Sequence, residues 1–359
     1  MSDVKECLKN MFSNQKLHLP YSWDDKDFIK SLEEMFELYL FSIEKYSCNI
    51  LNKEEINQIR KVTNLILNVV KEYLNGFPSK AFKNFEELME ILGTHELKTY
   101  KKSIIEHFEE AHSNFTLKLY RIVRIDKNPA EYVRSRVFHA PYSIRKKISN
   151  YRYSIAGFPS LYLATSLKLC CQETSCKSND NFIASRFEMN QNYENHHIDI
   201  RVIELGVKPQ DFLNNNVTSM RRIWQEIKND SVFCKSYLFW YPLIAACTFI
   251  KNDTNSKFYC VYILPQMLMQ WSRLNSITVS SNSKSLIGIR YFSCANKEAS
   301  EYGFNFVFPT SGQQNYNLFC NTLTKIFRLT KPCAIKDFCS INACEQHINN
   351  DIDLDFIEQ

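Results

Sequence analysis

Three side chains of complementary chemistry follow one another in the middle of the chain: Arg152, Tyr162 and Glu173. A guanidinium group can grip phosphate oxygens with two parallel hydrogen bonds, and a tyrosine offers a flat apolar ring with a hydroxyl group. A carboxylate can hold ribose hydroxyls and stabilise positive charge at an anomeric carbon, as carboxylates do in glycosidases. The three residues therefore suit a dinucleotide with a labile N-glycosidic bond, such as NAD. A structural salt bridge between Arg152 and Glu173 would explain the same residue types equally well.

The local pattern predicts a turn, a strand and a helix that could bring these three side chains into one cleft. Gly157 marks the turn, residues 161–165 are typical of a short strand, and residues 166–173 are typical of a helix. A further strand is predicted where apolar residues alternate over 117–125. Arg121 lies on the apolar face of that strand, and a charge that faces a core is costly unless it is paired. We therefore expect Arg121 to meet a carboxylate or an anionic ligand.

A series of short motifs occurs in order between about residues 115 and 310. They are Leu119-Tyr120-Arg121-Ile122, Arg152-Tyr153-Ser154, Gly157 to Ala164, Cys170-Cys171-Gln172-Glu173, Gly288 to Ser293, and Gly303 to Pro309. Together they resemble the RES domain family, whose members include toxins of bacterial toxin–antitoxin pairs. The resemblance implies an α+β fold related to the diphtheria-toxin-like ADP-ribosyltransferases, with small mixed sheets, flanking helices and NAD in a cleft.

The resemblance also assigns a role to each matching residue. Arg152, Tyr162 and Glu173 would be the catalytic residues. Arg152 and Arg121 would hold the pyrophosphate and the nicotinamide ribose, while Tyr162 would stack on or orient the nicotinamide. Glu173 would bind ribose hydroxyls and stabilise an oxocarbenium-like state.

Three other residues are candidates for binding NAD. Ser293 would donate or accept a hydrogen bond in the same pocket, and Arg290 is a further candidate for a phosphate. His139 precedes the arginine motif and lies either beside the pocket, as a binding group or general base, or in the core as a satisfied structural histidine.

The chain departs from the family pattern around the arginine. Typical members have Gly-Gly-Arg-Trp-Asn where this chain has Asn150-Tyr151-Arg152-Tyr153-Ser154. The loss of two glycines changes how closely the backbone can approach a ligand. A helical N-terminal region also has no counterpart in the small toxins. These departures indicate a longer subgroup of the family.

The sequence does not predict a metal site. His196 and His197 are adjacent in a predicted strand and therefore point to opposite faces. Cysteine and histidine residues also gather near the C-terminus, but without the usual zinc spacing; they are Cys333, Cys339, Cys344 and His347.

Hydrophobic periodicity predicts a helical region followed by a mixed domain. Apolar residues recur at steps of three and four over 28–43, 56–73 and 81–92. We therefore expect a helical N-terminal region over 1–112, with a regulatory or packing role.

The rest of the chain is rich in predicted strands. Beyond the strands named above, alternating segments lie at 198–202, 257–264, 287–293 and 304–308. They are not each followed by a helix of regular length, which favours an α+β fold over a doubly wound sheet. We expect a RES-like, NAD-binding catalytic domain over 113–335 and a C-terminal tail over 336–359.

Composition excludes several classes of protein. The sequence contains neither G-x-G-x-x-G nor G-x-x-x-x-G-K, which argues against Rossmann and P-loop nucleotide sites. The net charge of +5 is mild and scattered, so nucleic acid is not an expected partner. The 13 cysteines are odd in number and spread out, which indicates reduced thiols in the cytoplasm. The longest apolar run, 237–250, is too short to span a bilayer and predicts a buried helix.

These expectations combine into a bacterial, cytoplasmic NAD-consuming enzyme. It would be a RES-type NAD glycohydrolase or phosphorylase that passes ADP-ribose to water or phosphate, acting as a toxin or defence effector. ADP-ribosyl transfer to a macromolecule and nucleotide sensing without catalysis are the alternatives. NAD is the expected partner, and the sequence leaves open an inhibitory antitoxin or regulatory protein and assembly into a homo-oligomer. No membrane partner is expected.

Overall fold

The computed structural model divides into two compact units. Unit 1 comprises residues 1–101 and 207–268, and unit 2 comprises residues 102–206 and 269–359. No helix among the described residues is both long and apolar enough to cross a membrane. The structure describes residues 4–24, 27–47, 50–94, 117–125, 133–177, 180–189, 192–193, 196–213, 231–251, 256–277, 284–310, 318–335 and 340–357.

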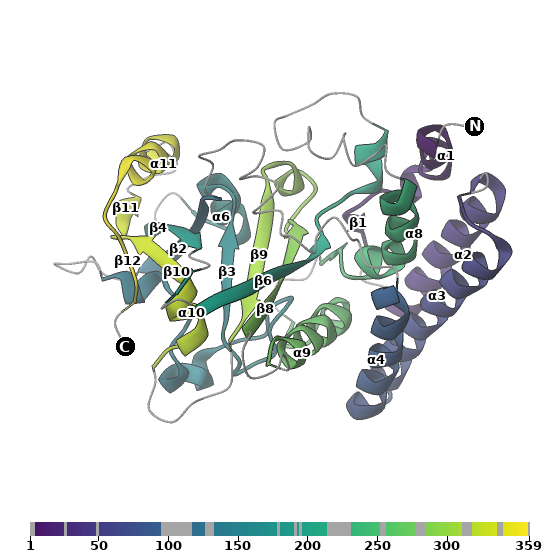
Figure 1. Ribbon diagram of the computed structural model, residues 1–359, viewed down its shortest axis with the longest axis horizontal. Coiled ribbons are helices and arrows are strands. Elements are labelled where there is room, and N and C mark those ends of the chain that lie inside the picture. Colours follow the sequence, from purple (N-terminus) through teal and green to yellow (C-terminus); the bar gives the residue numbers. More distant parts are fainter. Residues whose placement is uncertain are drawn as a thin grey trace. The chain divides into compact units, whose positions relative to one another are not determined.

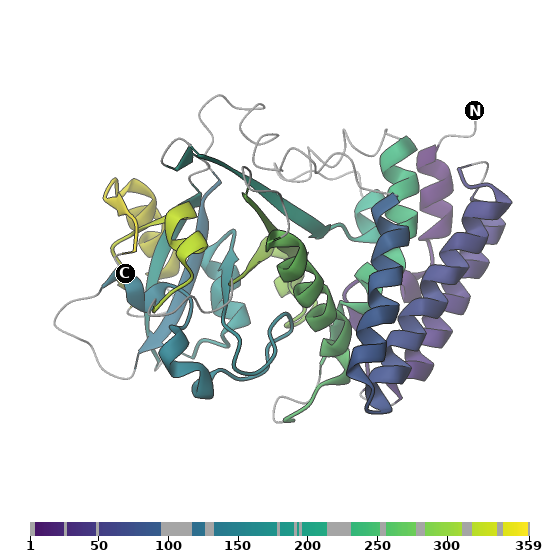
Figure 2. The ribbon, with the colours of Figure 1, turned by 60° about the horizontal axis from the view of Figure 1, so that its bottom comes forward.

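Unit 1 is mainly helical (Figures 1 and 2). Its helices are α1 (Val4–Met11), α2 (Phe28–Tyr46), α3 (Lys53–Leu74), α4 (Pro78–Thr94), α8 (Ser231–Ala246) and the first part of α9 (Ile263–Ile277). The sequence prediction of three amphipathic helices is confirmed by α2, α3 and α4, each of which buries one apolar stripe. Asn52 begins α3 with a capping box, in which it exchanges hydrogen bonds with Glu55.

Helix α8 joins the distant segment 207–268 to the N-terminal helices. It is mostly apolar, and most of its residues are buried. Tyr39 of α2 donates a hydrogen bond to the carbonyl of Leu238 (2.5 Å), and Tyr241 donates to the carbonyl of Leu17 (2.8 Å). The expected boundary at residue 112 therefore does not separate the two units, because segments far apart in sequence build one core.

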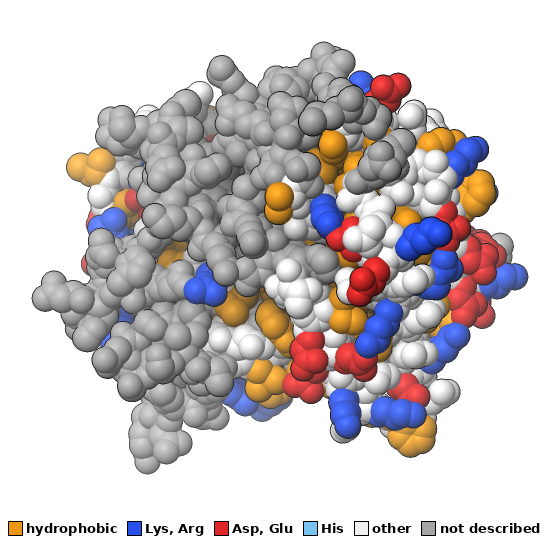
Figure 3. Space-filling model, turned by 45° about the vertical axis from the view of Figure 1, so that its right-hand side comes forward, with side chains coloured by type: hydrophobic (Ala, Val, Ile, Leu, Met, Phe, Trp, Pro, Cys, Tyr) orange, Lys and Arg blue, Asp and Glu red, His pale blue; other side chains and the backbone are white. Residues whose placement is uncertain are grey.

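Acidic and basic side chains are intermixed over the helical face seen in Figure 3. Ion pairs connect neighbouring helices, such as Lys71–Glu33 (2.8 Å) and Lys61–Glu87 (2.7 Å). Exposed pairs of this kind contribute at most about 1 kcal/mol each. The buried apolar stripes therefore supply most of the stability of these helices.

Unit 2 is built on a mixed sheet of ten strands with the order β12-β10-β4-β2-β3-β9-β8-β6-β5, in which β11 also pairs with β4. The strands are β2 (Leu119–Ile125), β3 (Ser160–Ala164), β4 (Asn181–Met189), β5 (Asn192–Tyr193), β6 (His196–Leu205), β8 (Lys284–Phe292), β9 (Phe304–Pro309), β10 (Phe327–Thr330), β11 (Cys333–Ile335) and β12 (Leu354–Asp355). Neighbouring strands are antiparallel except β6 and β8. The predicted α+β class is confirmed.

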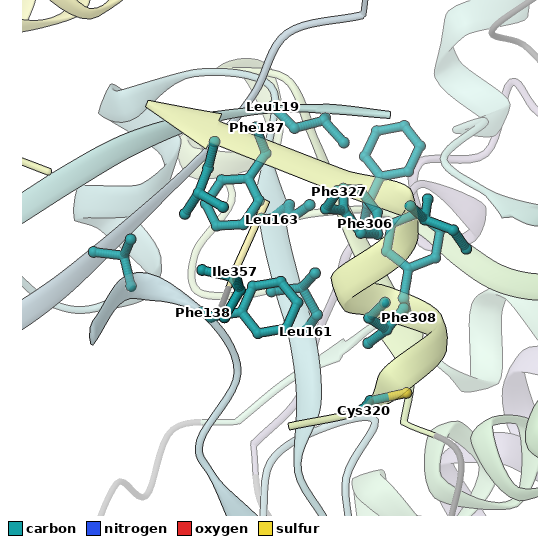
Figure 4. Close-up of a cluster of buried hydrophobic side chains, with 14 of the residues drawn as sticks. Leu119, Phe138, Leu161, Leu163, Phe187, Phe306, Phe308, Cys320, Phe327 and Ile357 are labelled. Atoms are coloured by element: carbon teal, nitrogen blue, oxygen red, sulfur yellow. The ribbon is translucent and has the colours of Figure 1, made fainter. Parts of the chain in front are cut away.

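The two faces of this sheet bury different sets of side chains. Leu161 and Leu163 of β3 face Phe308 and Phe306 of β9 across the ladder, and they belong to a large apolar core on one face (Figure 4). The alternate residues of β3 point to the other face, where α6 (Leu167–Glu173) and α11 (Ile341–Asn350) are packed. Helix α11 and strand β12 thus place much of the expected C-terminal tail within unit 2.

One predicted strand is wrong. Residues 257–264 form a 3-10 turn at Cys260–Tyr262 that leads directly into α9. The apolar residues that alternate there continue at helical spacing through Met267 and Leu268, and Pro265 is tolerated in the first turn of a helix. The short alternating segment was therefore the start of a helix.

Candidate functional site

Tyr162 of β3 lies on the face of the sheet that carries α6 and α11. Residues of β3, β9 and β8 lie side by side on this face. In the ladder, Ala164 of β3 faces Asn305 of β9, and Asn305 in turn faces Tyr291 of β8. The Tyr162 hydroxyl lies 2.8 Å from Ser154 Oγ, which donates a hydrogen bond to Ser160 Oγ (2.9 Å). These contacts hold the half-buried Tyr162 side chain in one orientation.

Arg152 is presented by a tight turn between Tyr151 and Ser154. The main-chain N–H of each of these two residues donates to the carbonyl of the other, at 2.9 Å and 3.1 Å. Gly157 follows with a φ of +81°, a conformation that favours glycine, and leads the chain into β3. The Tyr151 ring is half exposed and lies 6.0 Å from the Tyr162 ring. The turn therefore holds Arg152 near Tyr162 without a helix or strand of its own.

Glu173 ends helix α6 and is exposed to solvent. Ser166 caps the other end of this helix by accepting a hydrogen bond from Leu169 N (3.2 Å). Asn305 Nδ2 donates a hydrogen bond to Glu173 Oε1 (2.5 Å), and Oε2 accepts none from the described residues. The carboxylate is thus fixed by one oxygen and presents the other to solvent.

The pKa values of the buried residues Tyr291 and Cys294 are influenced by the charges of both Arg152 and Glu173. Burial raises the pKa of Tyr291 well above its usual value. Glu173, Tyr162 and Tyr153 raise it further, and Arg152 opposes the rise. Burial raises the pKa of the Cys294 thiol to about 11, with Arg152 lowering it and Glu173 raising it. The structure therefore brings the three predicted catalytic residues, Arg152, Tyr162 and Glu173, around one point of the sheet.

Arg121 of β2 alternates with Tyr120 and Ile122 of the face that carries α6 and α11, so its side chain starts from the other face of the sheet and reaches the main chain of β3. Strands β2 and β3 pair through Tyr120 and Ala164, and the Arg121 guanidinium donates to the carbonyl of Tyr162 (3.0 Å). Its Nε is buried and has no hydrogen-bond partner among the described residues. Burial lowers the pKa of Arg121, which the nearby Cys170 and Tyr162 partly offset. No carboxylate pairs with Arg121 in the described part of the chain, so an anionic ligand is the remaining expected partner.

Ser293 lies at the end of β8, next to Cys294, and is fully buried. Its hydroxyl accepts a hydrogen bond from Ala295 N (3.2 Å). Ser293 is two residues after Tyr291, and alternate residues of a strand point to the same face, so Ser293 points to the face that carries the site. Its position near Arg152 and Glu173 is consistent with the predicted binding role.

Arg290 points to the opposite face of β8. It forms a buried ion pair with Glu204 (Nε to Oε2, 2.6 Å) and lies 4.3 Å from the centre of the Phe304 ring. Burial raises the pKa of Glu204, and the Arg290 charge opposes this rise. The structure therefore does not bring Arg290 together with the other predicted site residues.

His139 is completely buried, and both of its ring nitrogens are used. Nδ1 lies 2.9 Å from the carbonyl of Ala140, and Nε2 accepts a hydrogen bond from Cys320 N (2.9 Å). Burial, and to a lesser extent Arg121, lowers the pKa of His139 to about 4. The geometry is that of a satisfied structural histidine, the second of the two interpretations offered by the sequence.

Several residues that support the site are not predicted as site residues by the sequence. Asn305, Tyr291 and Ser154 contact or underlie the predicted catalytic side chains. The signal for Asn305 was a polar residue inside the apolar strand Phe304–Phe306, since a buried polar group needs a partner. Its partner, Glu173, lies 132 positions away, so the pairing itself required the fold.

No cluster of three or more metal-ligating side chains occurs in the described part of the chain. Cys333 and Cys344 form a thiol hydrogen bond, which lowers the pKa of Cys333 to about 6. Cys339, the remaining cysteine of the C-terminal group, lies outside the described residues.

Comparisons with known proteins give one distant relative. The chain is 24% identical over 330 residues to a protein of Bacillus subtilis (strain 168) named "Putative toxin YopC". The match covers 86% of this chain and 66% of that protein, so the chain spans slightly less than two thirds of the relative's length. No protein-family model and no solved structure matches the chain. The similarity supports a distant relation to a protein named as a toxin.

Proposed function

We propose that the chain cleaves the bond between nicotinamide and ribose in NAD, as RES-type enzymes do. The observation that carries the proposal is the convergence of Arg152, Tyr162 and Glu173 near Tyr291. The two tyrosines that flank Arg152 lie against the rings of Tyr162 and Tyr291, and Asn305, which faces Tyr291 in the ladder, binds the Glu173 carboxylate. Each of the three supplies one requirement of the reaction: charge for phosphates, an aromatic face for the base, and a carboxylate for the developing cation.

Substrate binding would rely on the two arginines and the tyrosine. Arg121 and Arg152 would hold the pyrophosphate and the nicotinamide ribose through charge-assisted hydrogen bonds. Tyr162 would pack against the nicotinamide ring, and its own position is fixed by Ser154. The Nε of Arg121 is buried and has no hydrogen-bond partner in the described part of the chain. This supports the role, because an anion would relieve its loss of hydration.

The bond-breaking step would depend on Glu173. As the glycosidic C–N bond breaks, nicotinamide leaves with the bonding electron pair as a neutral molecule, and positive charge develops on the ribose. The Glu173 carboxylate would stabilise this charge and hold ribose hydroxyls through Oε2. Water then adds to the anomeric carbon and releases a proton, so that NAD and water yield ADP-ribose, nicotinamide and H⁺; phosphate as the acceptor would yield ADP-ribose 1″-phosphate instead.

Loss of NAD damages a cell, and this agrees with the name of the distant relative. We therefore propose a toxin or defence role in the bacterial cytoplasm, with the activity restrained by an inhibitory or regulatory protein.

The test is incubation of the purified full chain with NAD, followed by chromatography of the products with and without phosphate. We expect nicotinamide release by the wild type, and Glu173→Gln should reduce the rate by about 100-fold or more, as for other groups that stabilise transition-state charge. Glu37→Gln is a matched control, because Glu37 is an exposed carboxylate on α2, in the other unit.

Equal rates for the wild type and Glu173→Gln would overturn the proposed role of the carboxylate. Intact NAD with saturable binding of ADP-ribose would instead support a nucleotide-sensing module. Radiolabel from NAD that appears on a protein or nucleic acid, and disappears with Glu173→Gln, would establish ADP-ribosyl transfer.

A further inference from the structure

A second pair of arginines lies in unit 2, beside Phe158. Arg145 belongs to the 3-10 turn Tyr142–Lys147, and Arg273 belongs to the C-terminal part of α9. Their guanidinium carbons lie 5.4 Å and 4.9 Å from the centre of the Phe158 ring. Arg145 also lies 5.0 Å from the centre of the Tyr142 ring. Aromatic contacts thus hold both guanidinium groups in one place.

Neither guanidinium has an acidic partner within the described residues. The Nε atoms of both Arg145 and Arg273 are buried and make no hydrogen bond to the residues that the structure describes. Four other arginines of unit 2 are paired with carboxylates: Arg124 with Asp180, Arg134 with Asp353, Arg186 with Glu188, and Arg290 with Glu204. The pair at Phe158 is therefore two positive charges brought together without a counter-charge from the described part of the chain.

Such an arrangement is unfavourable unless something compensates for it. Burial lowers the pKa of Arg273, Tyr142 and Cys320 oppose this change, and the positive charge of Arg145 adds to it. Contact with an aromatic ring offsets only part of this cost, about 0.5–2 kcal/mol per cation. Stacking leaves the N–H edges of a guanidinium available, and these edges match a phosphate group through two parallel hydrogen bonds.

We propose that Arg145 and Arg273 form a phosphate-binding subsite beside Phe158. The ligand is a phosphate group, supplied either as free inorganic phosphate or by an adenine nucleotide. Phe158 lies four residues before Tyr162, so the two Cα atoms are at most about 14 Å apart along the chain. The proposal does not depend on the proposed cleavage of NAD.

The test is calorimetric titration of the full chain with inorganic phosphate and, separately, with AMP at constant ionic strength. We expect saturable binding to the wild type, and Arg145→Gln and Arg273→Gln should each weaken it about 10- to 100-fold, the effect of losing a charged hydrogen bond. Lys146→Gln is the matched control, because Lys146 is an exposed cation next to Arg145. Equal affinity for the two ligands would identify free phosphate as the source, and tighter binding of AMP would identify a nucleotide.

Thermal unfolding of every variant distinguishes a failure to fold from a failure to bind. Arg273→Lys is a further control, because it keeps the charge and the aliphatic stem. Weakened binding in Arg273→Lys with unchanged unfolding supports paired hydrogen bonds from the guanidinium. The proposal is overturned if the wild type binds neither ligand, or if binding is lost with Arg152→Gln but is unchanged in Arg145→Gln and Arg273→Gln. Phosphate binding that is weakened in Arg145→Gln and Arg273→Gln, by a chain that leaves NAD intact, would support the subsite while the proposed NAD cleavage fails.

Discussion

The hydrogen bond from Asn305 to Glu173 determines which carboxylate oxygen faces a ligand. Asn305 is buried in β9 and its amide has little freedom, so the carboxylate keeps one orientation. A residue of this kind positions a catalytic group without touching the substrate. Its contribution should appear in the rate of bond cleavage and in the pH dependence of that rate.

We expect Asn305→Ala to lower kcat for NAD cleavage about 10- to 100-fold, since a hydrogen bond to a charged group contributes about 1.5–3 kcal/mol. Asn305→Asp places a second carboxylate against Glu173 and should raise the pKa of Glu173, because like charges disfavour ionisation. The acid limb of the pH–rate profile should therefore move to higher pH. Asn296→Ala is the control, because Asn296 contacts Gln172 rather than Glu173; an unchanged profile in Asn305→Asp would contradict the positioning role.

His139 should make folding sensitive to acid. Its pKa is about 4 in the folded protein, compared with 6.5 for an unperturbed histidine, because burial disfavours the charged ring. The unfolded chain therefore binds more protons between these two pH values. The stability contributed by neutral His139 is complete above about pH 6.5 and is lost as the pH falls toward 4, by up to about 3 kcal/mol.

Urea unfolding at pH 7.5 and pH 5 tests this expectation. The wild type should lose about 2 kcal/mol from this residue over that interval, and His139→Asn, which cannot titrate, should lose correspondingly less. His347→Asn is the control, because His347 is an exposed histidine on α11. A pH dependence that is identical in His139→Asn and the wild type would show that this histidine does not carry the effect.

At the level of elements, the way in which helix α6 ends fixes the position of Glu173 in the structure. Thr174 N donates to Cys170 O (3.1 Å), Cys176 N donates to Cys171 O (3.1 Å), and Ser175 between them has a φ of +50°. This is a left-handed helix ending that glycine usually provides. The serine is strained there, and the strain lies next to the predicted catalytic carboxylate.

We expect Ser175→Gly to raise the free energy of unfolding by about 0.5–1 kcal/mol, because glycine adopts positive φ without the Cβ penalty. Ser175→Val should lower it, since a β-branched residue is disfavoured in that region. Urea unfolding measures both changes. The same serine-to-glycine change at Ser79, in the first turn of α4, should give no stabilisation. A gain at Ser79 equal to that at Ser175 would exclude the explanation from backbone strain.

Hydrophobic periodicity in the sequence was sufficient to predict most helices and strands, but it did not predict how they pack together. The long stripes of α2, α3 and α4 were predictable because each repeats over many turns, whereas the short apolar alternation at 257–264 did not distinguish a strand from the start of α9. The order of Arg152, Tyr162 and Glu173 suggested one site, and their proximity follows from the turn and from α6. The contact of Glu173 with Asn305 and the placement of Arg290 on the other face depend on strand register, which one sequence alone does not set.

At the level of the whole molecule, the chain leaves unit 2 at residue 206 and returns to it at residue 269. The intervening segment supplies α8 to unit 1, so the helical unit is built from two separate stretches of chain. The ring of Tyr241 lies 5.1 Å from that of Phe12 and 4.4 Å from that of Tyr39. Lys235 of α8 also forms an ion pair with Glu55 of α3. The N-terminal helices are therefore structurally necessary for the later segment, whether or not they also regulate activity.

This arrangement predicts that a chain restricted to residues 113–359 will aggregate. Removal of α1 to α4 uncovers the faces of α8 that bury Tyr237, Leu238 and Tyr241, and a large exposed apolar surface promotes association. Size-exclusion chromatography with light scattering should show oligomers or loss of protein, in contrast to the full chain. Co-expression of residues 1–112 as a separate polypeptide should restore a soluble complex, because the contacts with α8 are non-covalent. A monomeric, cooperatively unfolding 113–359 fragment would show that α8 does not need the N-terminal helices.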